Sequence, residues 1–151
     1  MDHTTNVLFD STILLGARLA DEPLRTQCRA ALALAESGAV RGHVSDCAVA
    51  ELAEELLRAA GVDATRRELA ALRAHVEVIP SEDAVLDACM QDVLAVGELY
   101  YEDVVTMLAA TENRMELIVT LNAADFGAAT TTRVTPPIEL LSEMQGLAGA
   151  A

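Results

Sequence analysis

The stretch Asn6-Val7-Leu8-Phe9-Asp10-Ser11-Thr12 contains the pattern on which the prediction of the fold depends. Its first four residues form a short, mainly apolar run that predicts a buried strand, and this run ends at Asp10. Ser11 and Thr12 are expected to cap a short helix over 13–19, because their hydroxyl oxygens can accept hydrogen bonds from free backbone N–H groups. A strand followed at once by a helix is the repeating unit of α/β folds.

The same alternation continues along the rest of the chain. Short strands that alternate with helices imply a parallel sheet with helices on both faces. We therefore expect a three-layer α/β/α domain with a central parallel sheet of four to five short strands. The predicted strands are 6–9, 41–44, 75–79, 117–120 and a weaker 132–134, and the predicted helices are 13–19, 23–37, 46–60, 63–72, 82–96, 103–113, 123–126 and 137–144.

The length and composition favour one domain. A chain of 151 residues can bury a sizeable core, which we expect over residues 1–145, with 146–151 as a flexible tail. The chain is 52% hydrophobic but only 3% aromatic, so its core must consist mainly of Ala, Leu and Val. No apolar run approaches the roughly 20 residues that span a bilayer, so no membrane partner is expected. The three cysteines are widely spaced, which argues against a disulfide framework and favours a cytoplasmic location.

The charge balance limits the possible functions. Ten basic residues, all of them arginine, face 24 acidic residues, which gives a net charge of −14. A field of this sign repels phosphate, so any chemistry on nucleic acid would need bound cations, a local arginine patch, or both. The lack of lysine excludes a Walker-A nucleotide site and a Schiff-base mechanism.

Acidic and polar side chains occur where a parallel sheet places its functional crevice, beyond the carboxyl ends of the strands. Carboxylate oxygens are the ligands that Mg²⁺ and Mn²⁺ prefer, and neighbouring carboxylates repel each other unless a cation neutralises them. Two such cations can activate water and stabilise a leaving oxygen. The candidate residues are Asp10 and Thr12 after the first strand, Glu51 in the third helix, Asp103 at the start of a later helix, and Thr120, Asn122 and Asp125 at the fourth strand.

Four segments resemble, in the same order, the sequence blocks of PIN-domain nucleases. The first, 6–12, is a strand that ends in Asp, and the second, 45–52, has a Ser that caps a helix with a Glu six residues later. The third, 103–110, is an Asp that begins an Ala-rich helix, and the fourth, 118–126, is a strand followed by Thr-x-Asn-x-x-Asp-Phe. By size, the chain is most similar to the VapC-type toxins of toxin–antitoxin pairs, which are Mg²⁺-dependent endoribonucleases.

The resemblance implies roles for these residues. Asp10, Glu51 and Asp103 would be catalytic metal ligands, and Asn122 or Asp125 would take the fourth position. Thr12 and Thr120 would support them, and the cofactor would be Mg²⁺ or Mn²⁺. The implied partners are a single-stranded RNA substrate, a small antitoxin and a second copy of the chain in a homodimer. The sequence departs from the family at Ser11-Thr12, where Thr-Asn is commoner, and at Thr106, where a His or similar polar residue is frequent.

Each candidate also has a purely structural explanation. Asp10 can cap the helix that follows it, and Asp103 can stabilise a helix N-terminus without a metal. Glu51 can be a solvated helix residue, and Asn122 with Asp125 can form a turn.

A weak RNA-binding cluster is also possible at Arg58, Arg66 and Arg67. These side chains can bind phosphate or pair with surface carboxylates. The main alternative for the whole chain is a PIN-like scaffold that binds a partner or RNA without cutting it, and the net charge of −14 favours this alternative.

Overall fold

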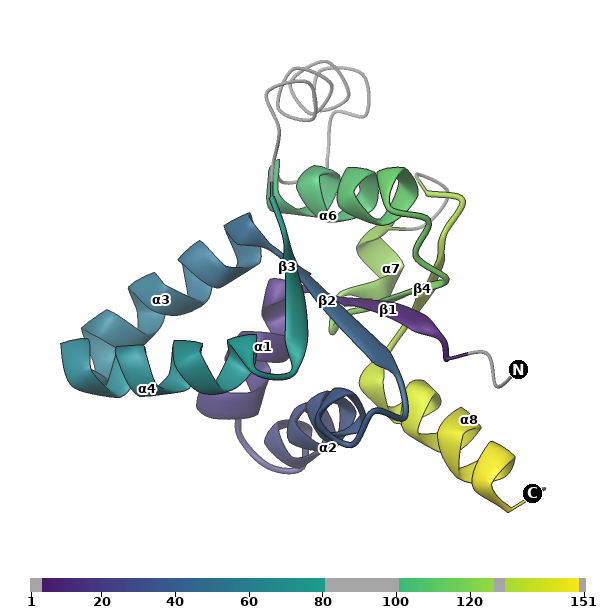
Figure 1. The fold of residues 1–151 in the computed structure, drawn as a ribbon, viewed down its shortest axis with the longest axis horizontal. Coiled ribbons are helices and arrows are strands. Elements are labelled where there is room, and N and C mark those ends of the chain that lie inside the picture. Colours follow the sequence, from purple (N-terminus) through teal and green to yellow (C-terminus); the bar gives the residue numbers. More distant parts are fainter. Residues whose placement is uncertain (1–3, 81–100, 127–129, 150–151) are drawn as a thin grey trace.

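A parallel sheet lies at the centre of the fold, with helices on both of its faces (Figure 1). The computed structural model describes residues 4–80, 101–126 and 130–149. All neighbouring strands pair in parallel, in the order β3-β2-β1-β4-β5. The prediction of a three-layer α/β/α domain with a short-stranded parallel sheet is therefore confirmed. The strands are β1 (Asn6–Phe9), β2 (Arg41–Ser45), β3 (Val76–Ile79), β4 (Leu117–Val119) and β5 (Arg133–Thr135).

Side chains of β1 alternate between two hydrophobic clusters because successive strand residues point to opposite faces. Val7 and Phe9 belong to the larger cluster, whereas Leu8 belongs to the smaller one. Among the described residues, five helices contribute to or cover the larger cluster and two the smaller one, on opposite faces of the sheet (Figure 1). The former are α1 (Ser11–Leu19), α2 (Leu24–Glu36), α3 (Asp46–Ala60), α4 (Val62–Arg73) and α8 (Pro137–Ala148), and the latter are α6 (Tyr101–Glu112) and α7 (Ala123–Phe126).

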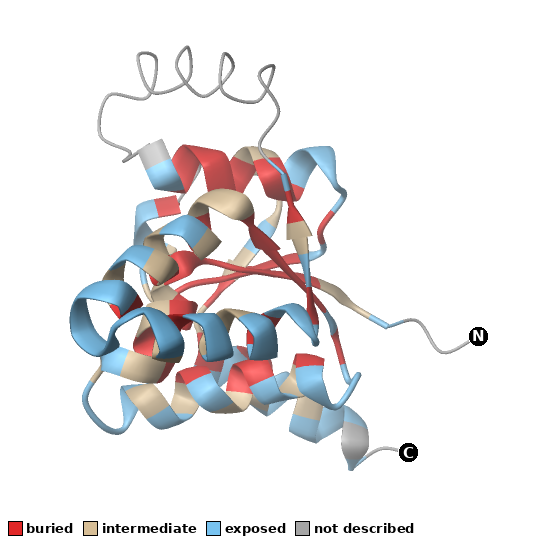
Figure 2. Cartoon of the chain, turned by 60° about the vertical axis from the view of Figure 1, so that its left-hand side comes forward, coloured by how far each residue is buried: buried red, intermediate tan, exposed pale blue. Residues whose placement is uncertain are grey.

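The strand register aligns the carboxyl ends of the central strands. Leu8 is level with His43 of β2, and Phe9 is level with Val119 of β4. Asp10 is therefore level with Ser45 and with the residue that follows β4. The central strands β1, β2 and β4 are largely buried, and the helices expose their outer faces (Figure 2). The sheet thus presents one buried polar edge at which candidate residues can meet.

Some predicted boundaries were wrong. The residue that caps α1 is Asp10 and not Ser11 or Thr12, because the helix begins at Ser11 and Asp10 has the extended backbone of a cap. Helix α8 continues to Ala148, four residues beyond the predicted end, because no helix-breaking residue occurs before Gly149 other than Gly146, which a helix tolerates. The predicted helix at 82–96 lies outside the described residues. None of the described helices is long and apolar enough to cross a membrane.

Candidate metal centre

Asp10 directly follows β1, the middle strand of the sheet, and is only 3% exposed. Its backbone N–H donates to Val119 O at 3.0 Å, which extends the pairing between β1 and β4 by one residue. Its side chain also caps α1, since Oδ2 accepts from Thr12 N at 3.4 Å. The capping role that the sequence offered as an alternative is therefore real, but this long bond uses little of the carboxylate's capacity.

Three threonine hydroxyls surround the Asp10 carboxylate. Oδ2 accepts from Thr12 Oγ1 at 2.8 Å and from Thr120 Oγ1 at 2.9 Å. Oδ1 accepts from Thr106 Oγ1 at 3.2 Å. These residues, Thr12, Thr106 and Thr120, are called the hydroxyl cradle below. Hydrogen bonds to a charged acceptor are stronger than neutral ones, so the cradle fixes the orientation of the carboxylate.

The cradle is itself held by backbone groups. Thr12 Oγ1 accepts from Leu121 N at 3.0 Å, and Thr120 Oγ1 accepts from Asn122 N at 3.1 Å. The two hydroxyls lie 3.2 Å apart. Each has one proton, and both protons reach Asp10 at shorter distances, so this last contact is a close approach and not a further bond. The loop after β4 is thereby fastened to the start of α1.

The carboxyl ends of the central strands form a region that favours negative charge. Helices α1 and α3 begin here, capped by Asp10 and Ser45, and the bond from Thr106 brings the first turns of α6 to the same place. Helix N-termini favour anions because their free N–H groups point outward. Asp103, in the first turn of α6, is 9% exposed. In the described chain, no arginine or histidine forms an ion pair with Asp10.

Glu51 provides an unpartnered acceptor. It lies one turn after Cys47, whose side chain packs against the smaller cluster beneath α6. Its Oε2 atom is buried and has no hydrogen-bond partner among the described residues. A buried carboxylate oxygen without a partner is costly, and a cation would satisfy it. Together with the oxygen-only donors of Asp10 and Asp103, this atom fits the chemistry of a hard divalent cation.

The side chains of the candidate residues do not all lie close to one another. Within residues 4–80, 101–126 and 130–149, no three His, Cys, Asp or Glu side chains gather closely enough to hold one metal ion. A cation shared by Asp10, Glu51 and Asp103 would therefore require side-chain rearrangement. Without a cation, the three carboxylates repel each other. Asn122 and Asp125 are exposed and form a turn in which Asp125 N donates to Asn122 O at 2.9 Å. Their choice for the fourth position stays open, and all the ligand assignments stay predictions.

The predicted arginine cluster lies away from this edge. Arg58 is near the far end of α3, about 18 Å along the helix axis from Asp46. Its guanidinium forms ion pairs with Glu54, at 2.7 Å, and with Glu55. Arg66 and Arg67 are exposed on α4. Contact between this cluster and RNA stays a prediction, and phosphate bound there would be distant from Asp10.

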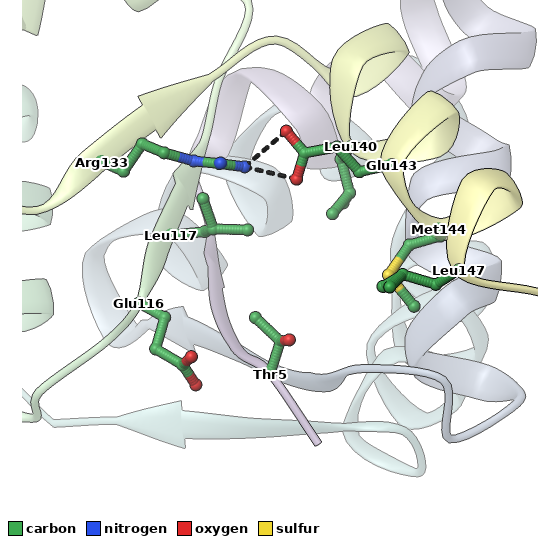
Figure 3. A pocket seen from close by; sticks show the side chains of 8 residues that line it. All are labelled: Thr5, Glu116, Leu117, Arg133, Leu140, Glu143, Met144 and Leu147. Carbon is green, nitrogen blue, oxygen red and sulfur yellow. Dashed lines mark hydrogen bonds and ion pairs between the residues drawn. The ribbon is translucent and has the colours of Figure 1, made fainter. Parts of the chain in front are cut away.

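A separate pocket of about 290 Å³ lies at the opposite end of the sheet (Figure 3). It borders the starts of β4 and β5, with Leu117, Leu140 and Leu147 among its apolar lining. Arg133 closes one side by donating to both carboxylate oxygens of Glu143 (Figure 3). Because the Arg133 guanidinium is already paired with Glu143, it has no free charge to offer an anionic ligand in this pocket.

Comparison with known families agrees with the order of the sequence blocks and with the fold. The family model described as the PIN domain matches residues 6–124. The chain belongs to the PIN domain family. Of the proteins with curated descriptions, none matches the sequence.

Several solved structures share the PIN fold of this chain. A toxin–antitoxin complex from Klebsiella pneumoniae is 20% identical, with a TM-score of 0.64, over 87% of this chain and 97% of that one. VapC20 of Mycobacterium tuberculosis, described as a toxin that cleaves the sarcin–ricin loop, is 17% identical with a TM-score of 0.68, over 86% and 99%. VapBC-1 of Haemophilus influenzae is 15% identical with a TM-score of 0.66, over 87% and 98%. At these identities the likeness shows a shared fold.

Sequence reasoning missed one member of the cradle. Thr106 was noted only as a departure from the PIN pattern and was not among the candidate site residues. A signal was present, because Thr106 follows Asp103 by three residues and the two therefore lie on one helix face. What could not be predicted is that this face is turned toward Asp10.

Proposed function

We propose that this PIN-domain protein is a divalent-cation-dependent endoribonuclease that cleaves single-stranded RNA and acts as the toxin of a toxin–antitoxin pair. The observation that carries the proposal is the buried Asp10 carboxylate, held by three hydroxyls and lacking an ion-pair partner in the described chain. A purely structural cap would not need a charge so deeply buried, since an exposed Ser or Thr caps a helix equally well.

Each residue has a role in this proposal. Asp10, Glu51 and Asp103 would hold Mg²⁺ or Mn²⁺, and Asn122 or Asp125 would complete the set. Thr12 and Thr120 orient Asp10 through its Oδ2 atom. The bound cation would supply charge neutralisation and Lewis-acid polarisation of the phosphodiester. Burial of Asp10 and Asp103 would strengthen the attraction between their carboxylates and the cation.

The described ion pairs reduce the positive charge that arginine can offer to RNA. Within the residues that the structure describes, carboxylates pair with Arg18, Arg25, Arg58 and Arg133. Those paired side chains have less charge to offer to phosphate. The divalent cations would therefore carry much of the contact with the RNA backbone, and affinity should depend weakly on monovalent salt.

The partners follow from the same proposal. Two of the solved structures named above are described as a toxin–antitoxin complex and as VapBC-1, so we expect a small antitoxin for this chain. We also expect a cytoplasmic homodimer. Expression of the chain alone should slow growth of a bacterial host, and Asp10→Asn should relieve that effect.

Cleavage of a mixed RNA pool tests the enzyme directly. The wild type is incubated with Mg²⁺, with Mn²⁺ and with excess chelator, beside Asp10→Asn and Asp103→Asn. Asp63→Asn is the matched control, since Asp63 is an exposed acid on α4. We expect cleavage with metal in the wild type and in Asp63→Asn alone. Cleavage that persists in chelator, or in both site variants, would refute the proposal.

The alternative function is a PIN-like scaffold that binds without cutting. It is favoured by the net charge of −14 and by the separation of the carboxylates in the described structure. If the wild type is folded yet cuts no RNA with either metal, and still retains RNA or a partner protein on a column, this alternative replaces the enzyme.

A further inference from the structure

The hydroxyl of Thr106 behaves differently from three other hydroxyls that lie within helices. Thr65, Thr111 and Ser142 each donate to the carbonyl oxygen four residues earlier in their own helix, at 2.9, 3.0 and 2.9 Å. This local bond is the usual choice for a hydroxyl within a helix. Thr106 instead donates to Asp10, 96 residues away in sequence, although it is only 4% exposed. Its hydroxyl therefore links α6 to the end of β1.

The two oxygens of Asp10 are unequally occupied. Oδ2 receives two short hydroxyl bonds and the long bond from Thr12 N. Within the described part of the chain, Oδ1 receives one bond, from Thr106, at 3.2 Å the longest of the three hydroxyl contacts. An ionised carboxylate has about two acceptor positions on each oxygen. Oδ2 is therefore filled, and Oδ1 is the atom with capacity to spare.

Thr106 also connects two of the proposed ligands. It lies one helical turn after Asp103, so a bond from its hydroxyl fixes the first turns of α6 relative to Asp10. Partners that orient a metal ligand contribute to the affinity of the site, because they reduce the rearrangement needed when the cation binds.

We infer that Thr106 is a positioning residue that orients Asp10 Oδ1 and the start of α6 for binding of a divalent cation. The inference rests on the proposed metal site and adds a residue to it. Thr106→Val removes the hydroxyl and retains the branched shape, so the affinity for the cation should fall by about 10- to 100-fold. Thr106→Ser retains the hydroxyl and should stay within about 3-fold of the wild type.

The test is titration of the purified chain with Mn²⁺, followed by electron paramagnetic resonance of the free ion and by calorimetry. Wild type, Thr106→Val, Thr106→Ser and Asp10→Asn are compared. Thr111→Val is the control, since Thr111 lies on the same helix and its hydroxyl donates to Met107 O of that helix. Circular dichroism in chelator establishes that each variant is folded. If Thr106→Val does not fold, Thr106→Ala takes its place, since it adds no new volume beside Asp10.

The outcomes separate the inference from the proposal beneath it. Weak binding in Thr106→Val, with normal binding in Thr106→Ser and Thr111→Val, supports the inference. Equal affinity in the wild type and Thr106→Val overturns it while the metal site stands, provided that Asp10→Asn binds weakly. Equally weak binding in Thr106→Ser and Thr106→Val also overturns it, because the hydroxyl is then irrelevant. Failure of the wild type to bind Mn²⁺ overturns both the inference and the proposed function.

Discussion

Replacing Thr120 with valine removes one hydroxyl from the hydroxyl cradle and keeps the shape of the side chain. Thr120 is fully buried. Its hydroxyl donates to Asp10 Oδ2 at 2.9 Å and accepts from Asn122 N at 3.1 Å. The substitution therefore takes one donor from a buried carboxylate and one acceptor from a backbone N–H group. We expect Thr120→Val to destabilise the fold in the absence of any metal.

The size of the loss follows from these two bonds. A hydrogen bond to a charged group contributes about 1.5–3 kcal/mol, and an amide left without a partner adds about 1 kcal/mol when water can partly reach it. The expected loss in the free energy of unfolding is thus about 2.5–4 kcal/mol. For a chain of this length, that corresponds to a fall in Tm of about 5–16 °C. It is smaller than the whole stability of a typical domain, so the variant should still fold.

Urea unfolding in chelator, followed by circular dichroism, measures this loss. Thr65→Val is the matched control, because Thr65 is 4% exposed and its hydroxyl makes one neutral bond, to Gly61 O at 2.9 Å. That control should lose only about 0.5–1.5 kcal/mol. A loss in Thr120→Val that is below 1 kcal/mol, or no larger than the loss in Thr65→Val, would refute the description of the cradle as a stabilising network.

Three further predictions concern packing, protonation and thiol chemistry. Gly42→Ala should lower the free energy of unfolding by about 1–3 kcal/mol, because a Cβ there would lie 2.7 Å from Ala35 Cβ. Gly146→Ala, where a Cβ meets nothing within 4 Å, should raise it by about 0.5–1 kcal/mol; thermal melts that give both changes the same sign would contradict this pair. Burial holds the pKa of His43 below its usual value, against the opposing effect of Glu77, so the folded state binds fewer protons than the unfolded one and stability is lost as the pH falls through about 6.5. The urea midpoint of His43→Gln should therefore change less than that of the wild type between pH 7.5 and 5.5, and an equal change in both would exclude His43 as the cause. Burial also raises the pKa of the Cys28 thiol, so native protein should alkylate more slowly at Cys28 than at Cys47, and peptide mapping should find that urea removes the difference.

The general fold was predictable because each strand carries its own local signal. Apolar runs such as the one in β4 are short, β-branched and followed by polar residues, which distinguishes them from helices. Alternation with helices then requires parallel pairing. The order of the strands was not predictable in the same way, since nothing local to β1 says that its neighbours are β2 and β4. That order depends on packing between segments far apart in the chain.

The candidate site shows the same division. Asp10, Asp103 and Glu51 could be selected because each begins or follows an element at a recognisable distance in sequence. Thr12 and Thr120 of the hydroxyl cradle were predicted as supporting residues. Thr106 was not, because a threonine inside a helix has the same local pattern as Thr111, whose hydroxyl donates to Met107 O of its own helix. The cap on α1 was assigned to the wrong residue for a related reason. Ser11, Thr12 and Asp10 are all good caps, and only the start of the helix decides between them.

The distance in sequence between Asp10 and its partners affects how the protein is made. Thr106 and Thr120 follow Asp10 by 96 and 110 residues. At about 5–20 residues per second, a ribosome synthesises Thr120 roughly 5–20 s after Asp10. A nascent chain in that interval has the first carboxylate but lacks two of the hydroxyls that orient it, together with the strand on which one of them depends. If the protein cuts RNA, translation itself delays the completion of the cutting site until most of the chain has left the ribosome that is reading its message.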